Sequence, residues 1–129
     1  MSNPHALIID DNPLNIDVLV MLLENEAVRC SSIESFRQLP NTLDKIGQVD
    51  VIFLDLEFPN GDGFDVLLDL KSDPRLQDVP IVAYTVHTSE IDRARRAGFD
   101  SFLGKPLSPS RFPSQLNRIL NGERIWEVN

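Results

Sequence analysis

The chain has 129 residues, of which 20 are acidic and 12 are basic, so its formal net charge is -8 at pH 7. This length favours one domain with its own hydrophobic core, and we expect residues 1–129 to form one unit, with a core at about 5–121 and a short tail at 122–129. The negative charge argues against direct binding to the phosphate backbone of DNA or RNA.

The ends of the chain and its cysteine content bear on the compartment. A run of about eighteen apolar residues, the minimum for a membrane helix, does not occur, and residues 1–5 lack the features of a signal sequence. Cys30 is the only cysteine, so no disulfide can form within the chain. These features predict a cytoplasmic protein without a membrane segment.

Short apolar segments alternate with segments of helical periodicity, and this pattern predicts five consecutive strand–helix units. We expect strands at Ala6–Ile9, Val28–Ser31, Val51–Leu54, Ile81–Tyr84 and Ser101–Leu103. The first, third and fourth are continuously apolar, which is typical of parallel strands covered by helices on both faces.

The first helix is expected to follow Asn12, with Pro13 in its first turn. One apolar face should pack on the sheet, formed by Leu14, Val18, Leu19, Leu22 and Leu23. This assignment leaves Ile16, Val20 and Met21 as an apolar outer stripe, and exposed apolar patches tend to be contact sites for partners.

The other helices are predicted from caps and breakers. The second covers about residues 35–46, the third opens at Gly61 and Gly63 and stops before Pro74, and the fourth is capped by Thr88 or Ser89. A fifth helix should begin near Ser110 and end at Gly122. Core-facing residues are expected to include Leu68 in the third helix and Ala97 in the fourth, and Trp126 in the tail is expected to pack on its own domain or across a dimer.

Five right-handed strand–helix units predict a three-layer, flavodoxin-like (βα)5 fold, an α/β doubly wound parallel sheet of strand order 2-1-3-4-5. In such sheets ligands bind beyond the carboxyl ends of the strands, where the order reverses between the first and third strands. Asp10 and Asp11 end the first predicted strand, and Asp55 follows the third.

These three carboxylates should lie close together and repel one another. Two unit charges about 4 Å apart cost about 4 kcal/mol at an effective dielectric constant of 20. The cluster must therefore take up protons or bind a cation, and Mg²⁺ is a suitable cation because it binds carboxylates together with a phosphate. Capping of the first helix by Asp10 or Asp11 is the simpler structural explanation for those two residues.

Thr85 follows the fourth predicted strand, and Lys105 follows the fifth, directly before Pro106. A hydroxyl can donate to a phosphoryl oxygen, and an ammonium can offset its charge. Each residue alone is compatible with an ordinary position at a strand end. Together with the three aspartates at the same edge of the sheet, they predict a site for a phosphoryl group.

Four segments resemble the successive motifs of response regulator receiver domains. They are Ile8 to Asn12, then Val51 to Asp55 followed by Pro59 and Gly61, then Tyr84 and Thr85, and finally Phe102 to Pro106. The resemblance implies that Asp55 is the phosphoacceptor of a two-component phosphorelay. It further implies a Mg²⁺ ion held by Asp10, Asp11, Asp55 and the backbone carbonyl of Glu57.

By the same resemblance, Thr85 and Lys105 contact the phosphoryl oxygens, Thr85 and Phe102 form a conformational switch, and the Lys105-Pro106 peptide bond is cis. Four residues would flank the site, namely Glu57, Val86, His87 and Pro106. Val86 departs from the small residue that is usual after the switch threonine, which predicts a narrower approach for water to the phosphorus.

A receiver of this kind is a signalling switch rather than an enzyme, since it catalyses only its own phosphorylation and dephosphorylation. The resemblance implies a histidine kinase or a histidine phosphotransfer protein as donor. It also implies a downstream protein target, or a second copy in a homodimer, that contacts the fourth helix, the fifth strand and the fifth helix.

Two other functions fit parts of the pattern. A pseudo-receiver would bind proteins without being phosphorylated, but the full set of acid, hydroxyl and lysine residues argues against it. A phosphatase of the haloacid dehalogenase type would use Asp55 as nucleophile and Glu57 as general acid. That family has Asp at the second position and its nucleophile on the first strand, which makes this alternative the weaker one.

Overall fold

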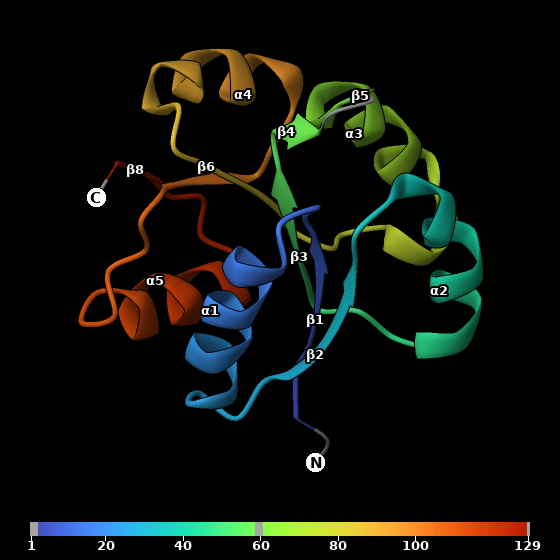
Figure 1. Cartoon of the computed structure of the whole chain (residues 1–129), viewed down its shortest axis with the longest axis horizontal. Helices are drawn as coiled ribbons and strands as arrows, with labels where there is room; N and C mark the ends of the chain where they lie inside the picture. The colour runs from blue at the N-terminus through green and yellow to red at the C-terminus, as the bar shows by residue number, and fades with distance from the viewer. Residues whose placement is uncertain (1–2, 59–60, 129) are drawn as a thin grey trace.

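A six-stranded parallel sheet forms the middle layer of the molecule in this computed structural model, which describes residues 3–58 and 61–128 (Figure 1). The order β2-β1-β3-β6-β7-β8 contains the predicted order of five strands, which is therefore confirmed, and adds a sixth at the β7 edge. The strands are β1 (His5–Ile9), β2 (Arg29–Ile33), β3 (Val51–Asp55), β6 (Ile81–Thr85), β7 (Ser101–Gly104) and β8 (Trp126–Glu127). A separate antiparallel pair is formed by β4 (Glu57–Phe58) and β5 (Gly61–Asp62). Pro59, which belongs to the second motif, lies outside the described residues.

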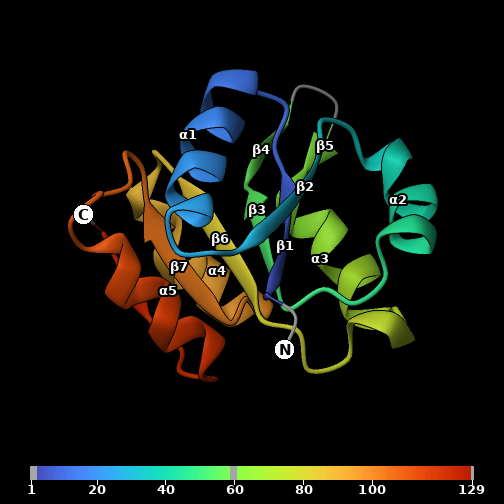
Figure 2. The ribbon, with the colours of Figure 1, turned by 90° about the horizontal axis from the view of Figure 1, so that it is seen from below.

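Helices cover both faces of the sheet (Figure 2). Two of them, α1 (Pro13–Glu24) and α5 (Phe112–Leu120), lie on one face, and α2 (Leu39–Ile46), α3 (Gly63–Ser72) and α4 (Ile91–Ala97) lie on the other. Each face encloses its own hydrophobic cluster, because alternate residues of the strands point to opposite sides. In the described ranges no helix is long and apolar enough to cross a membrane.

The starts of the helices follow local chemistry. The Asn12 side chain accepts hydrogen bonds from the backbone N–H groups of Leu14 and Asn15, and Pro13 occupies the first turn, as predicted. The second and fourth helices begin later than expected, because each is preceded by a 3₁₀ turn, at Phe36–Gln38 and Thr88–Glu90. The prediction that Thr88 or Ser89 caps the fourth helix is therefore wrong.

The predicted inward face of α1 is also wrong. Leu14 and Val18 are 74% and 48% exposed, whereas Ile16 is only 7% exposed and packs with Leu19, Leu22 and Leu23 in the core. The apolar residues that remain outside are Leu14, Val18 and Met21, at the helical spacing i, i+4 and i+7. Leu68 on α3 and Ala97 on α4 are likewise exposed rather than inward.

The tail contributes the sixth strand, because residues 126–127 pair with β7 in parallel (Figure 1). The Ile125 carbonyl accepts a hydrogen bond from the Phe102 N–H at 2.8 Å, and the Ile125 N–H donates to the Ser101 hydroxyl at 3.0 Å. Ile125 is buried, and the Trp126 ring lies under the Arg95 guanidinium at 4.7 Å. The prediction that Trp126 packs on its own domain is confirmed.

Candidate functional site

Four of the parallel strands bring polar residues to one edge of the sheet. Asp10 and Asp11 follow β1, Asp55 ends β3, Thr85 ends β6 and Lys105 follows β7. A pocket of about 560 Å³ opens there, and its lining includes Asp11, Asp55, Thr85 and Lys105. The predicted convergence at this edge is present in the structure.

The three aspartates form a compact group. One carboxylate oxygen from each of Asp10, Asp11 and Asp55 lies within 4.8 Å of the others. Asp10 and Asp55 are buried, and Asp11 is half-buried at the mouth of the pocket. Oxygen ligands at this spacing suit a hard cation such as Mg²⁺, so the residues fit the ion that the sequence predicts.

Lys105 lies between two of the carboxylates. Its Nζ is 3.3 Å from Asp10 Oδ2 and 3.6 Å from Asp55 Oδ1. The ammonium also lies over the ring of Tyr84, 4.2 Å from the ring centroid. One cation therefore partly balances three carboxylates, and the group keeps a negative excess that favours a further cation.

Burial of the Asp55 carboxyl raises its pKa to about 7. The Lys105 ammonium opposes this rise in pKa, while the Asp10 and Asp11 carboxylates add to it. The side chain that ends β3 thus loses its proton near neutral pH, and a bound cation would favour the ionised form.

Besides Lys105, two uncharged donors hold Asp10, one on each of its oxygens. Oδ1 accepts from the Asn12 N–H at 2.9 Å, and Oδ2 accepts from the Tyr84 hydroxyl at 2.6 Å. Burial, followed by the charge of Asp10, raises the pKa of Tyr84 far above its ordinary value, so the phenol stays a donor. The sequence places Tyr84 in a strand and in the third motif, but it does not predict this bond.

The predicted switch residue Thr85 is buried, whereas the residues predicted to flank the site are exposed. The Thr85 hydroxyl accepts from the His87 N–H at 3.1 Å. The His87 imidazole contacts the Glu57 carboxylate, and both side chains are exposed. Val86 is 60% exposed and lines the pocket.

Phe102 and Pro106 lie on the β7 side of the site. Phe102 is completely buried in the cluster beneath α2, α3 and α4, where Trp126 packs against the same cluster. The Lys105-Pro106 peptide bond is cis, as the resemblance implied. Phe102 therefore connects β7 to the tail in two ways, by its backbone hydrogen bond to Ile125 and by packing in the same cluster as Trp126.

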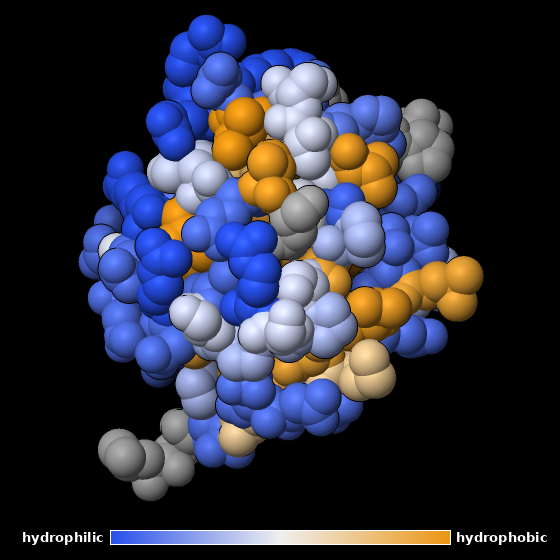
Figure 3. Space-filling view, turned by 90° about the vertical axis from the view of Figure 1, so that its left-hand side faces the viewer, coloured by the Kyte–Doolittle hydropathy of each residue, from blue (hydrophilic) through white to orange (hydrophobic). Residues whose placement is uncertain are grey.

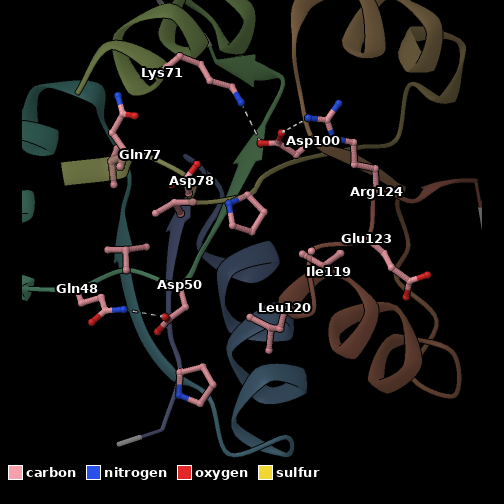
Figure 4. A pocket seen from close by; sticks show the side chains of 16 residues that line it. Gln48, Asp50, Lys71, Gln77, Asp78, Asp100, Ile119, Leu120, Glu123 and Arg124 are labelled. Carbon is pink, nitrogen blue, oxygen red and sulfur yellow. Dashed lines mark hydrogen bonds and ion pairs between the residues drawn. The ribbon is translucent and has the colours of Figure 1, made fainter. Parts of the chain in front are cut away.

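A second pocket, of about 770 Å³, lies at the opposite end of the sheet (Figure 4). Lys71 and Arg124 both point toward Asp100 in this pocket, at 3.0 and 3.7 Å from its carboxylate oxygens. Their charges are used in ion pairs that join α3, β7 and the tail. The chemistry predicted from the sequence therefore concentrates at the Asp55 pocket rather than in this larger one.

Comparison with known proteins gives a family. The family model described as response regulator receiver domain matches residues 6–117. The two-component response regulator ORR13 of Oryza sativa subsp. japonica is 31% identical over 121 residues, which cover 92% of this chain and 100% of that protein. The response regulator ORR3 of Oryza sativa subsp. indica is 29% identical over 119 residues, which cover 91% of each chain.

Solved structures show the same fold. The chemotaxis protein CheY4 of Vibrio cholerae superposes with a TM-score of 0.80 at 20% identity, covering 91% of this chain and 98% of that one. The receiver domain of a sensor histidine kinase from Pseudomonas aeruginosa PAO1 superposes with a TM-score of 0.79 at 24% identity, covering 92% and 98%. That structure contains a magnesium ion coordinated in its active site cleft.

Proposed function

Because the chain belongs to the response regulator receiver family, we propose that it accepts a phosphoryl group on Asp55 from a phosphohistidine of a kinase or phosphotransfer protein. The observation that carries this proposal is the group of Asp10, Asp11 and Asp55 within 4.8 Å of one another, with Lys105 beside them. No other pocket described above combines a buried carboxylate with an adjacent ammonium at the carboxyl ends of the strands.

The transfer requires an ionised Asp55. One of its oxygens attacks the phosphorus, a P–O bond forms and the P–N bond to the donor histidine breaks, and the leaving imidazole nitrogen keeps the electron pair and takes a proton. Lys105 and the Thr85 hydroxyl then contact oxygens of the aspartyl phosphate. Water later attacks the same phosphorus, which releases phosphate and restores Asp55.

Asp11 and Asp55 would hold a Mg²⁺ ion, with the Glu57 carbonyl as a further ligand and Asp10 acting through a bound water. The bound ion would offset charge on the phosphoryl oxygens during transfer. The compact carboxylate group supports this assignment, as does the magnesium in the related receiver domain of Pseudomonas aeruginosa.

A small acyl phosphate tests the proposed function without a partner protein. Incubation with Mg²⁺ is expected to label the chain once, at Asp55, and a chelator is expected to prevent the labelling. Mass spectrometry of peptides locates the label. Binding of partners without any labelling would favour the pseudo-receiver function instead.

The affinity for Mg²⁺ is expected to depend on pH. A proton on Asp55, whose pKa is about 7, competes with the cation. The apparent affinity should therefore fall about tenfold for each pH unit below 7 and level off above about 8. Calorimetric titration at several pH values measures this, and an affinity that stays constant between pH 5 and 8 would contradict a ligand whose pKa is about 7.

The apolar stripe of α1, which is Leu14, Val18 and Met21, begins two residues after the pocket residue Asn12 and suits a helical phosphohistidine partner. Val18→Asp is expected to slow transfer from a phosphohistidine donor at least tenfold while labelling by a small acyl phosphate persists. Leu68→Asp is the matched control, because Leu68 is equally apolar and is 70% exposed on α3, on the other face of the sheet. Equal slowing by both variants would contradict docking on α1.

Val86 is expected to limit the rate at which the aspartyl phosphate is hydrolysed. Its branched side chain lines the pocket together with Glu57 and Thr85, where it should narrow the approach of water. Decay of the phosphorylated protein should be faster in Val86→Ala, by about tenfold if the lost crowding is worth about 1.4 kcal/mol. An unchanged or slower decay would assign the rate to the Glu57 and His87 pair instead.

The read-out surface proposed for this chain includes its own sixth strand. In the surface formed by α4, β7 and α5, β8 pairs with the edge of β7 that would otherwise be free. Hydrophilic side chains cover most of this side of the molecule, and hydrophobic ones form smaller groups between them (Figure 3). Glu127 accepts from Gln115 at 2.8 Å and pairs with Arg111 and Arg118, which holds β8 to α5. A target protein or a second copy that docks here would contact β8 rather than pair directly with β7.

A further inference from the structure

We propose that Tyr84 is a positioning residue of the phosphoryl site, one whose hydroxyl holds Asp10 so that Lys105 is free to move to the phosphoryl group. The inference rests on the proposed function and deepens it. It is carried by the hydroxyl-to-carboxylate hydrogen bond of 2.6 Å and by the stacking of the Lys105 ammonium on the same ring.

The position of Tyr84 is fixed by the sheet. Tyr84 pairs with Asp55 on the neighbouring strand β3, and its side chain points to the face covered by α1 and α5. The ring packs edge-on against Phe53, with centroids 6.2 Å apart, and is 1% exposed. A buried, packed ring leaves the hydroxyl with little freedom, so it acts as a fixed donor to Asp10 across β3.

Asp10 Oδ2 accepts hydrogen bonds from two donors, and only one of them, Lys105, moves in the proposed transfer. The Tyr84 hydroxyl lies at 2.6 Å and the Lys105 ammonium at 3.3 Å. In the proposed transfer Lys105 must leave Asp10 for a phosphoryl oxygen, and a buried carboxylate that loses its charged partner is costly unless other donors remain on the same oxygen. Tyr84 removes that difficulty, because Asp10 keeps a strong donor after Lys105 has moved.

The ring face has a second effect on the same lysine. An ammonium over a tyrosine ring is attracted by the ring quadrupole, and Lys105 lies there at 4.2 Å while also 3.6 Å from Asp55. The contact keeps the charge between the two carboxylates rather than against Asp10 alone. Hydroxyl and ring together hold Lys105 close to the place where the phosphoryl group would form.

Tyr84→Phe separates the hydroxyl from the ring, since it keeps the packing on Phe53 and the stacking of Lys105. Without the hydroxyl, Lys105 should pair more tightly with Asp10 and compete more strongly with a cation. The Mg²⁺ affinity measured by calorimetry is expected to fall about three- to tenfold, and the rate of labelling by a small acyl phosphate about tenfold, in line with the usual net contribution of one hydrogen bond.

Phe112→Leu is the control for a purely structural effect. Phe112 packs against Phe53, with centroids 6.2 Å apart, in the same cluster as Tyr84, and its loss should lower stability without changing Mg²⁺ affinity. A third measurement uses the fact that Tyr84 is the only tyrosine. Its near-ultraviolet absorption, taken as the difference between wild type and Tyr84→Phe, is expected to shift when Mg²⁺ binds, because the charges beside the ring change.

The outcomes separate this inference from the proposed function. Unchanged Mg²⁺ affinity in Tyr84→Phe, with the wild type still labelled at Asp55, would overturn the role of Tyr84 and leave the phosphoacceptor intact. A fall in affinity together with a wild type that no donor labels would overturn the phosphoacceptor and support Tyr84 as a positioning residue of a metal site. Equal effects of Tyr84→Phe and Phe112→Leu on Mg²⁺ affinity would overturn the inference in either case.

Discussion

Asp55→Asn is expected to abolish labelling by a small acyl phosphate and, at the same time, to make the protein more stable when Mg²⁺ is absent. The amide cannot act as the attacking oxyanion, so the first effect should be complete. The second follows from the buried position of Asp55 among like charges, which raises its pKa to about 7. Asparagine keeps the shape of the side chain and removes the charge.

The pH dependence of this second effect has a defined sign. The folded protein holds the Asp55 proton up to about pH 7, whereas the unfolded chain releases it near the ordinary value of 3.8. The contribution of Asp55 to stability is therefore favourable at low pH and is lost as the pH rises from about 4 to about 7. At pH 8 the variant should exceed the wild type by about 2 to 4 kcal/mol in the free energy of unfolding.

Denaturant titrations of both proteins at pH 4 and pH 8 measure this gap, with Asp17→Asn on the outer part of α1 as a control for the loss of one surface charge. Saturating Mg²⁺ should close the gap, because the cation stabilises the ionised wild type only. If Asp55→Asn were less stable than the wild type at pH 8 without Mg²⁺, the ionised Asp55 would not destabilise the folded protein and this prediction would be wrong.

Gly63→Ala is expected to damage both the fold and the site, since Gly63 touches the backbone that carries Asp55. A Cβ atom there would lie 2.7 Å from the Asp55 carbonyl oxygen and 2.9 Å from Leu56 Cα. Neither backbone atom can rotate away as a flexible side chain would. The start of α3 must then shift against the end of β3, at a cost of about 1 to 3 kcal/mol.

The same shift should displace the Asp55 carboxylate, and misplacement by about 1 Å slows a positioned reaction as much as a hundredfold. Labelling of Gly63→Ala under conditions where it is folded should therefore be at least tenfold slower than that of the wild type. Gly47→Ala is the control, because nothing lies within 4 Å of the added Cβ atom there, while the positive φ of 72° at Gly47 strains an alanine and so lowers stability without a contact to the site. The control should lose stability and keep its labelling rate, and equal labelling by both variants would contradict the contact.

The site could be predicted from the sequence because its residues follow apolar strands at fixed places. Parallel strands align their carboxyl ends, so Asp10, Asp55, Thr85 and Lys105 had to meet once the five strands were recognised. Their partners were harder to predict. The Tyr84 hydroxyl reaches a carboxylate 74 residues earlier in the chain, and nothing local distinguishes it from other strand aromatics.

The rotation of α1 could not be predicted for a related reason. Between residues 14 and 23 most side chains are apolar, so more than one face satisfies the helical period. Packing decides between them, and it selects Ile16 over Leu14 and Val18. The sixth strand has only two residues, Trp126 and Glu127, which is too short for any alternating pattern.

The sixth strand also has a consequence for aggregation. An open strand edge is a template for pairing with other chains, and β8 covers the edge of β7 that would otherwise be open. Because β8 has only two residues, this protection depends on a very short segment of the tail. A chain that ends at residue 124 should therefore aggregate more readily than residues 1–129, because its β7 edge stays open.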